Sequence, residues 1–368
     1  MKHETMSGIE TLLEKGREEG IYPGAVLLAA SQGVIRIFLA VGKRALAPRS
    51  LPMEKETLFD LASLTKPLAT TMAMMKLVND GRIGLDTPLQ ALLPCTLPDD
   101  KRGITPRLLL SHAAGFVDWM PFYLELDRAA PKDRKAISRN RLLTLPLVSP
   151  PGRRSLYSDL GFMLLEWVIE ATAGLDLPRF LNQEFYTPLA LEHTGFFSAG
   201  PPSRFTQDGF AATEACPWRK RIIQGAVHDE NACALGGYSG HAGLFGTAEE
   251  VYRLANLLRE RWRGEGDDYL GPGTVRTFFT RQDIVKGSTW ALGWDTPSAE
   301  ASSAGRHFSP FSVGHLGFTG TSLWMDLEQD VIVILLTNRI HPTRKNQKIR
   351  AFRPLLHDRV MEAFGLIQ

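Results

Sequence analysis

The stretch Leu58-Phe-Asp-Leu-Ala-Ser-Leu-Thr-Lys-Pro-Leu68 contains Ser63 and, three residues later, Lys66, and it is the only S-x-x-K in the chain. On a helix, residues three apart share a face, so the lysine can reach the serine hydroxyl. A desolvated amine there could take the serine proton and activate a weak nucleophile. Residues 61–75 are otherwise apolar, and a lysine in a buried helix needs a reason. We interpret Ser63 as a nucleophile; the alternative is a solvated lysine on a helix.

A second candidate is Tyr157, the only tyrosine of seven with Asp or Asn two residues on, here Asp159. It follows a Pro-Pro-Gly turn and precedes an apolar helix predicted over 160–173. A loop tip before a helix can project a catalytic side chain into a cleft. A phenol close to an ammonium can have its pKa lowered, which would make Tyr157 a general base. The alternative is a tyrosine that packs against the helix start.

The third candidate is His315-Leu-Gly317, at the start of an expected hairpin whose two runs, 313–326 and 330–338, are separated by Leu327-Glu-Gln. The second run is apolar enough for a central strand. Glycine lets a substrate lie close to the strand, and the amide of Phe318 could point into an oxyanion hole. A competing H-x-G at His241 leads into a helix start with Thr247 as N-cap, so we interpret that one as a structural turn.

Together these motifs resemble the serine β-lactamase-like family, which includes class C β-lactamases, low-molecular-weight penicillin-binding proteins, D-aminopeptidases and family VIII esterases. The resemblance extends over residues 21–338. It rests on Ser63-x-x-Lys66, Tyr157-x-Asp159 and His315-x-Gly317 in that order, and on Pro23-Gly-Ala-Val26, Ile104-Thr-Pro-Arg-Leu-Leu-Leu-Ser-His-Ala-Ala-Gly115, Gly240-His-Ala-Gly-Leu-Phe-Gly246 and Gly314-His-Leu-Gly-Phe-Thr-Gly-Thr-Ser-Leu-Trp324.

The resemblance implies an acyl-enzyme on Ser63, with Lys66 and Tyr157 handling protons. It implies an oxyanion hole formed by the amides of Ser63 and Phe318. The substrate-binding residues it implies are Asp159, His315, Gly317 and Trp119, with a packed tryptophan as the alternative for the last.

Two departures from the family pattern bear on the substrate. The second motif usually ends in Asn, whose amide can donate to a substrate carbonyl, whereas an ionised Asp159 cannot. The third motif of true β-lactamases is usually Lys-Thr-Gly, which is absent here. His315 can be neutral or charged, so a permanent cation for a substrate carboxylate is missing at that position. Both changes count against efficient β-lactam turnover and suit a hydrolase of another amide or ester.

Other chemistries lack their motifs: the chain contains no G-x-S-x-G, no H-E-x-x-H and no G-x-x-x-x-G-K-[ST]. The cluster His228-Asp229-Glu230 has metal-capable side chains, but neighbours on a loop rarely converge on one ion, and we interpret it as a loop scaffold. We expect no metal and no cofactor. The net charge of +2, with mixed signs, predicts no nucleic-acid partner.

The first residues lack the apolar segment of a signal peptide, and Ile9, Leu12 and Leu13 instead mark one face of an amphipathic helix. The three cysteines have no metal spacing and suit reduced thiols. The sequence has no run of about twenty apolar residues, so we predict no membrane-spanning helix. We therefore expect a cytoplasmic protein. The oligomeric state stays open.

Strand patterns occur at 25–30, 34–41, 293–295, 314–318 and 331–337, and helical patterns dominate between them. We expect one α+β domain of β-lactamase/transpeptidase type, an antiparallel sheet flanked by helices with an inserted helical lobe. Its approximate lobes are 1–70 with 240–368 for the sheet, and 71–239 for the helices.

The expected function is hydrolysis of an amide or peptide bond through an acyl-enzyme on Ser63, with a small molecule or short peptide as substrate and peptidoglycan-derived peptides as one candidate. A carboxylesterase for short acyl chains is one alternative. A catalytically silent ligand-binding or scaffold protein of the same fold is the other, although a drifted site would be expected to lose Lys66 or Tyr157 first.

Overall fold

A computed structural model describes residues 3–197, 204–266 and 269–367 of the chain. Its centre is a six-stranded antiparallel sheet in the order β3-β2-β1-β11-β10-β9. The strands are β1 (Gly24–Ser31), β2 (Val34–Ala45), β3 (Leu51–Pro52), β9 (Ser312–Leu316), β10 (Ser322–Asp326) and β11 (Val331–Thr337).

The register confirms that strands from the two ends of the chain pair with each other. Ala25 of β1 lies opposite Thr337 of β11, and the pairing runs on to Ser31 opposite Val331. Every residue of β11 is buried, which confirms the prediction of a central strand. A strand buried on both faces needs an apolar side chain at nearly every position, and 331–337 supplies one.

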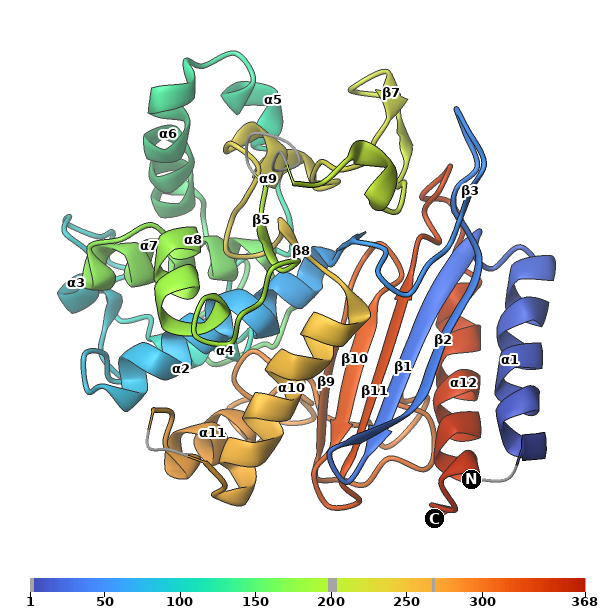
Figure 1. Cartoon of the computed structure of the whole chain (residues 1–368). Helices are drawn as coiled ribbons and strands as arrows, with labels where there is room; N and C mark the ends of the chain where they lie inside the picture. The colour runs from blue at the N-terminus through green and yellow to red at the C-terminus, as the bar shows by residue number, and fades with distance from the viewer. Residues whose placement is uncertain (1–2, 198–203, 267–268, 368) are drawn as a thin grey trace.

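Helices cover both faces of the sheet (Figure 1). On one face, α1 (His3–Glu18) and α12 (Ile349–Ala363) lie side by side, and they share a core with β1, β2 and β11. Ile9 and Leu13 belong to that core, as their spacing predicted. On the other face, α10 (Ala248–Arg263) packs on β1 and β11, and Thr247 caps its first turn.

The chain between the two halves of the sheet forms a second, mainly helical part beside it (Figure 1). It is tied to the rest by a small sheet, β4 (Phe59–Asp60), β8 (Leu244–Gly246) and β5 (Gly195–Phe196), and it also holds the hairpin β6 (Ala215–Cys216) and β7 (Arg221–Ile222). Its α-helices are α2 (Met72–Asn79), α3 (Leu89–Leu92), α4 (Pro106–Leu110), α5 (Tyr123–Leu126), α6 (Pro131–Thr144), α7 (Asp159–Ala173), α8 (Leu177–Leu181) and α9 (Glu230–Ala234). Helix α11 (Pro272–Phe279) packs against α10 and α2.

Two strand predictions need correction. Residues 313–326 are not one strand but two, β9 and β10, joined by a turn at 317–321 that places Gly317 beside Thr321. Residues 293–295 form no strand: Asp295 makes only isolated bridges, to Trp290 and Gly314. The apolar residue there, Trp294, is buried in the core. Three residues are too few for a period of two to distinguish a strand from a buried loop.

The predicted helix at 61–75 is built from three kinds of turn. A 3₁₀ turn, η1 (Ala62–Leu64), leads into a π-helical segment, η2 (Lys66–Thr71), and then into α2. Pro67 lacks an amide hydrogen, and π turns concentrate at functional sites. Within the described residues, none of the helices combines the length and apolar character needed to span a bilayer.

Candidate active site

Ser63 and Lys66 meet as their spacing predicted. The Lys66 ammonium donates to Ser63 Oγ at 3.0 Å and to the carbonyl of His241 at 3.1 Å. It also pairs with Asp159 Oδ1 at 2.6 Å, and the whole lysine side chain is buried. Burial alone would lower the pKa of Lys66, but Asp159 and Tyr157 outweigh it, so this pKa lies above its ordinary value. Lys66 is therefore an ammonium in the resting site.

The backbone before Ser63 is held in an unusual conformation. Ala62 has a positive φ of 48°, which non-glycine residues seldom adopt. The carboxylate of Asp60 stabilises it by accepting from the Ala62 amide at 2.9 Å. The β9–β10 turn is bonded to the same segment, because Thr319 donates to the Asp60 carbonyl and Thr321 to the Leu61 carbonyl. The nucleophile and the strand edge are thus fixed to each other.

Gly317 and Phe318 lie at this edge. A Cβ on Gly317 would lie 2.7 Å from the Leu61 carbonyl oxygen and closer still to Thr321 Oγ1, so no other residue fits. The Phe318 amide makes no hydrogen bond within the described ranges, as an oxyanion donor requires. The Phe318 carbonyl accepts from Arg339 Nε at 3.0 Å and from its terminal nitrogen at 2.6 Å. Arg339 therefore fixes the peptide that directly follows the expected oxyanion-hole amide.

Tyr157 reaches both partners that the motif implied. Its phenol lies within hydrogen-bonding reach of Lys66 and Ser63, and its ring packs against those of His112, Trp290 and His315. Burial raises the pKa of Tyr157, and the charge of Lys66 only partly opposes this. The expectation of a lowered pKa is corrected here, because burial outweighs the charge of Lys66 and the nearby carboxylate of Asp159 adds to the effect of burial. Tyr157 is a neutral phenol that can donate a proton.

His315 is buried and neutral. Its Nδ1 lies 2.9 Å from the Leu316 carbonyl and donates to it, so Nε2 is an acceptor. That Nε2 is buried and has no partner within the described ranges. Burial and the charge of Lys66 lower the pKa of His315 to about 3. Of the two states considered for His315, the neutral one applies at physiological pH.

His241 is not merely a structural turn, and that prediction is corrected. Its carbonyl accepts from Lys66, and its buried imidazole Nε2 lies 3.0 Å from Asp229 Oδ1. Donor atoms of Asp159, Asp229 and His241 all lie within 4.8 Å of one another. Asp159 therefore faces the catalytic lysine on one side and a histidine–aspartate pair on the other.

A pocket of about 380 Å³ opens beside Ser63. Tyr157, His315, Gly317 and Phe318 line it near the nucleophile. Trp119 does not belong to its wall: it is 39% exposed and contacts the ring of Tyr123. Trp290, which the sequence did not single out, lines the pocket instead.

Three arginines line the same pocket: Arg339, Arg350 and Arg353. Arg353 is 4% exposed; it donates to the Thr321 carbonyl at 3.3 Å, and its Nε has no partner in the described part of the chain. Burial and the other two arginines lower the pKa of Arg353 to about 10, so it remains charged. None of the three forms an ion pair with a described carboxylate. The third motif lacks a permanent cation, but these arginines place cations in the same pocket.

One carboxylate among the described residues, Asp295, also lines this pocket. Burial raises its pKa to about 6, and its interactions are with Thr289, the Thr296 amide and Arg281. The arginines of the pocket thus lack a counterion, although an acid is nearby.

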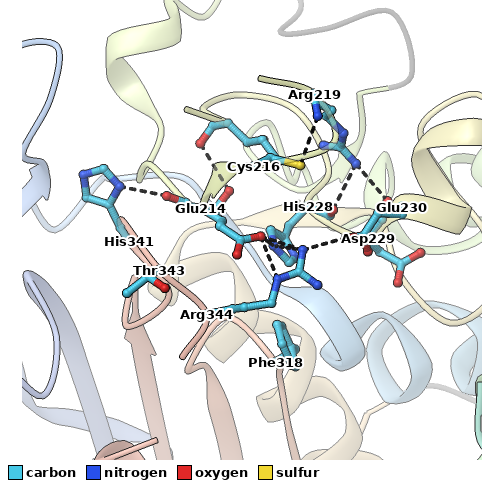
Figure 2. Close-up of polar contacts among 12 residues, drawn as sticks. Glu214, Cys216, Arg219, His228, Asp229, Glu230, Phe318, His341, Thr343 and Arg344 are labelled. Atoms are coloured by element: carbon cyan, nitrogen blue, oxygen red, sulfur yellow. Dashed lines mark hydrogen bonds and ion pairs between the residues drawn. The ribbon is translucent and has the colours of Figure 1, made fainter. Parts of the chain in front are cut away.

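The cluster His228-Asp229-Glu230 does not converge on one point. Figure 2 shows its side chains turned toward different partners. His228 bonds Glu214 at 3.1 Å, and Glu230 pairs with Arg344 at 2.6 Å. Arg344 also pairs with Glu214, and its guanidinium and the His228 ring lie against the ring of Phe318. This network supports Phe318 from behind.

Comparisons with known proteins identify the family. The model of the Beta-lactamase family matches residues 9–357. The chain belongs to the beta-lactamase family. It is 31% identical to an N-acetylmuramyl-L-alanine amidase of Bacillus subtilis (strain 168) over 365 residues, which cover 90% of this chain and 80% of the amidase. It is 32% identical to a "Putative D-alanyl-D-alanine carboxypeptidase" of Salmonella agona (strain SL483), over 80% of this chain and 72% of that protein.

Solved structures agree on the fold. EstCE1, a hydrolase with promiscuous acyltransferase activity, superposes with a TM-score of 0.76 at 24% identity and covers 97% of this chain and 98% of its own. As a member of the beta-lactamase family with relatives named as hydrolases, the chain is a serine hydrolase. The α+β β-lactamase/transpeptidase fold expected from the motifs is confirmed.

Sequence reasoning missed the residues whose role depends on distant segments. Asp229 and His241 are twelve residues apart and carried no spacing signal of their own. The arginines of the pocket lie after the last motif, in the locally basic stretch 339–353, and such a stretch is by itself typical of a solvated surface. The signal that could have found them is the absence of acidic residues from that stretch.

Proposed function

We propose that this beta-lactamase family member hydrolyses amide bonds whose leaving group is an amino acid or short peptide with a free carboxylate. The observation that carries this proposal is the buried, unpaired guanidinium of Arg353 in the pocket that holds Ser63. An isolated buried cation costs several kcal/mol, about the scale expected for a site that waits for an anion. Arginine also matches carboxylate geometry well.

The relatives' names support the same substrate class. One names a bond to L-alanine and the other a bond between two D-alanines, so both reactions release an amino-acid or peptide amine. Peptidoglycan-derived peptides are therefore the substrates we propose.

The reaction begins with attack of Ser63 Oγ on the amide carbon. The new C–O bond forms as the carbonyl electron pair moves onto oxygen, where the amides of Ser63 and Phe318 would hold it. Collapse of this intermediate breaks the C–N bond, and the neutral phenol of Tyr157 donates the proton that the leaving amine needs. Lys66 gives a proton to Tyr157 and takes the proton of Ser63 Oγ, so one proton passes from the serine to the leaving amine. Water then attacks the acyl carbon, the bond to Ser63 Oγ breaks, and one proton of the water returns along the same path to Ser63.

The test compares matched substrates. We expect an N-acylated D-alanyl-D-alanine to have a kcat/KM at least about tenfold above its C-terminal carboxamide, since charge-assisted bonds contribute about 1.5–3 kcal/mol. Muramyl-L-alanine compounds, short p-nitrophenyl esters and a chromogenic cephalosporin complete the panel. Equal rates for carboxylate and carboxamide would contradict the proposal, and faster turnover of neutral esters would favour the carboxylesterase alternative.

We also propose a cytoplasmic location. It is supported by Cys95, Cys216 and Cys233, which are all free thiols in the structure. Fractionation of cells that make an epitope-tagged chain tests this, and recovery of the tag outside the cytoplasm would contradict it.

A further inference from the structure

The resting site lacks an obvious acceptor for the Ser63 proton. Lys66 is an ammonium and has no lone pair, and Tyr157 is a neutral phenol. The nearest anionic acceptor is Asp159, whose Oδ1 lies 2.6 Å from the Lys66 nitrogen. The family pattern usually has Asn at this position, and an amide cannot take a proton under these conditions. A site with Asp at this position therefore has a proton acceptor that a site with Asn lacks.

The geometry places Lys66 between donor and acceptor. Its nitrogen contacts Ser63 Oγ at 3.0 Å and Asp159 Oδ1 at 2.6 Å. The His241 carbonyl takes a third contact and fixes the direction of the ammonium. A proton can leave the lysine toward one partner as another arrives from the other, with no movement of heavy atoms beyond hydrogen-bonding distance.

His241 is rigidly held on the far side of Asp159. Its imidazole is 1% exposed and bonds Asp229, which also caps α9 by accepting from the Ala232 amide at 2.7 Å. The preceding Gly240 is fixed by Glu166 and Thr70, which bond its amide and its carbonyl. A Cβ on Gly240 would collide with the Phe162 carbonyl, so a residue with a side chain does not fit at this close approach to α7.

The charged groups around this centre balance one another. Burial alone would lower the pKa of His241, but the carboxylates of Asp229 and Asp159 outweigh it and raise this pKa above its ordinary value. Lys66 opposes that effect. The charge of His241 and the hydrogen bonds from His241 and the Ala232 amide outweigh burial and hold the pKa of Asp229 well below its usual range. Two cations thus face two carboxylates.

We propose that Asp159 is the final acceptor of the Ser63 proton, reached through Lys66, and that His241, held by Asp229, is the positioning residue beside Asp159. In the step, Lys66 Nζ gives one proton to Asp159 Oδ1 and takes one from Ser63 Oγ, while Oγ bonds the acyl carbon. Lys66 ends as it began, and one proton has moved from Ser63 to Asp159. When the leaving amine takes a proton from Tyr157, the proton on Asp159 returns through Lys66 to the phenol. This inference rests on the proposed acyl-enzyme at Ser63.

The test is the pH dependence of Ser63 acylation by a fluorophosphonate in the full chain. Asp159→Asn, which is nearly isosteric, should lower the plateau rate by about a hundredfold or more, the usual contribution of a general base. A plateau within a few-fold of the wild type would overturn the role of Asp159.

His241→Gln preserves the backbone carbonyl that contacts Lys66 and removes only the cation. We expect the acid limb of the profile to move to higher pH, because the two neighbouring carboxylates then lack the positive charge that lies beside them in the wild type. Asp229→Asn combined with His241→Gln removes the anion as well and should bring the limb back toward the wild type. His193→Gln, at a histidine whose partner is Glu250, is the control.

Superimposable profiles of wild type and His241→Gln would overturn the role of His241, and a shift that persists in the double variant would show a structural effect instead. If His241→Gln does not fold, the Asp159→Asn profile still decides whether a carboxylate is required. Wild-type labelling is measured first: a failure there rejects the acyl-enzyme itself, whereas labelling with unchanged variant profiles rejects only the proton path.

Discussion

The lysine end of the active site, buried beside Ser63, and its arginine end, in the wall of the pocket, differ in how their charges are balanced. At the lysine end, Lys66 and His241 face Asp159 and Asp229, and each cation contacts a carboxylate. At the arginine end, three guanidiniums line the wall, and none of them pairs with a carboxylate in the described ranges. A balanced set of charges can move protons without a large change in net charge. An unbalanced set is costly on its own and is satisfied when an anion arrives.

From this difference we infer that the lysine end carries out the chemistry and that the arginine end recognises the substrate. The strand edge around Gly317 separates them and fixes Ser63 against both. Changes at the lysine end should therefore affect kcat, and changes at the arginine end should affect KM and discriminate between substrates.

The largest effect should come from breaking the balanced end. Lys66→Met removes the group that connects Ser63 to Asp159, and we expect acylation to slow by about a thousandfold. Stopped-flow measurement with an activated ester gives this rate. Lys76→Met is the matched control, because Lys76 belongs to the same helical stretch and pairs only with Asp80 among described carboxylates. Equal losses in both variants would contradict a specific role for Lys66.

The second-largest effect should come from a change at the strand edge around Gly317. Gly317→Ala places a methyl group against the Leu61 carbonyl and Thr321, and it should displace the Phe318 amide. We expect kcat to fall about a hundredfold, as for loss of one oxyanion donor, and the free energy of unfolding to fall by about 1–3 kcal/mol. Gly8→Ala, where an added Cβ meets nothing, controls for the substitution itself. Unchanged kcat in the folded variant would count against this oxyanion edge.

The unbalanced end can be neutralised with Arg353→Met. We expect kcat/KM for the carboxylate substrate to fall about 10- to 100-fold, while the matched carboxamide is little affected. The free energy of unfolding should rise by about 1 kcal/mol or more, because an unpaired buried charge is replaced by an apolar side chain. Kinetics and urea unfolding measure the two effects. Arg359→Met, on the same helix but exposed and paired with Glu362, should show neither.

A last effect concerns the dependence of stability on pH and not the rate of the reaction. The folded-state pKa of His315 is about 3 against an ordinary value of 6.5, so between these values the unfolded chain binds a proton that the folded chain does not. The contribution of His315 to the free energy of unfolding is therefore fully present above pH 6.5. It is lost as the pH falls, at up to about 1.4 kcal/mol per pH unit. His315→Gln should flatten this part of the unfolding curve. His357→Gln should do the same without loss of activity, since the pKa of His357 is also about 3 and it bonds Ser303 away from the pocket.

Much of the balanced end was predictable from the sequence because its central residues are local. Ser63 and Lys66 are three apart on one helical stretch, and Tyr157 and Asp159 are two apart at a helix start. Spacing of this kind fixes relative position almost independently of the rest of the fold. The central strand β11 followed in the same way from its uninterrupted apolar run.

The remaining parts depended on tertiary structure. Arg353 lines the pocket only because the fold places α12 beside it. Its burial cannot be inferred from a basic stretch of sequence. The raised pKa of Tyr157 depends first on its burial and then on the charges of Lys66 and Asp159 beside it, and only the fold shows these. His241 looked like a turn because its neighbours are glycines, and only the fold shows its side chain against Asp229.

The most direct test of the central claim is the intact mass of the protein after incubation with a fluorophosphonate. We expect one covalent adduct on the wild type, the same adduct on Ser7→Ala at an exposed serine of α1, and none on Ser63→Ala. An adduct that persists in Ser63→Ala, or its absence from the folded wild type, would contradict Ser63 as the nucleophile.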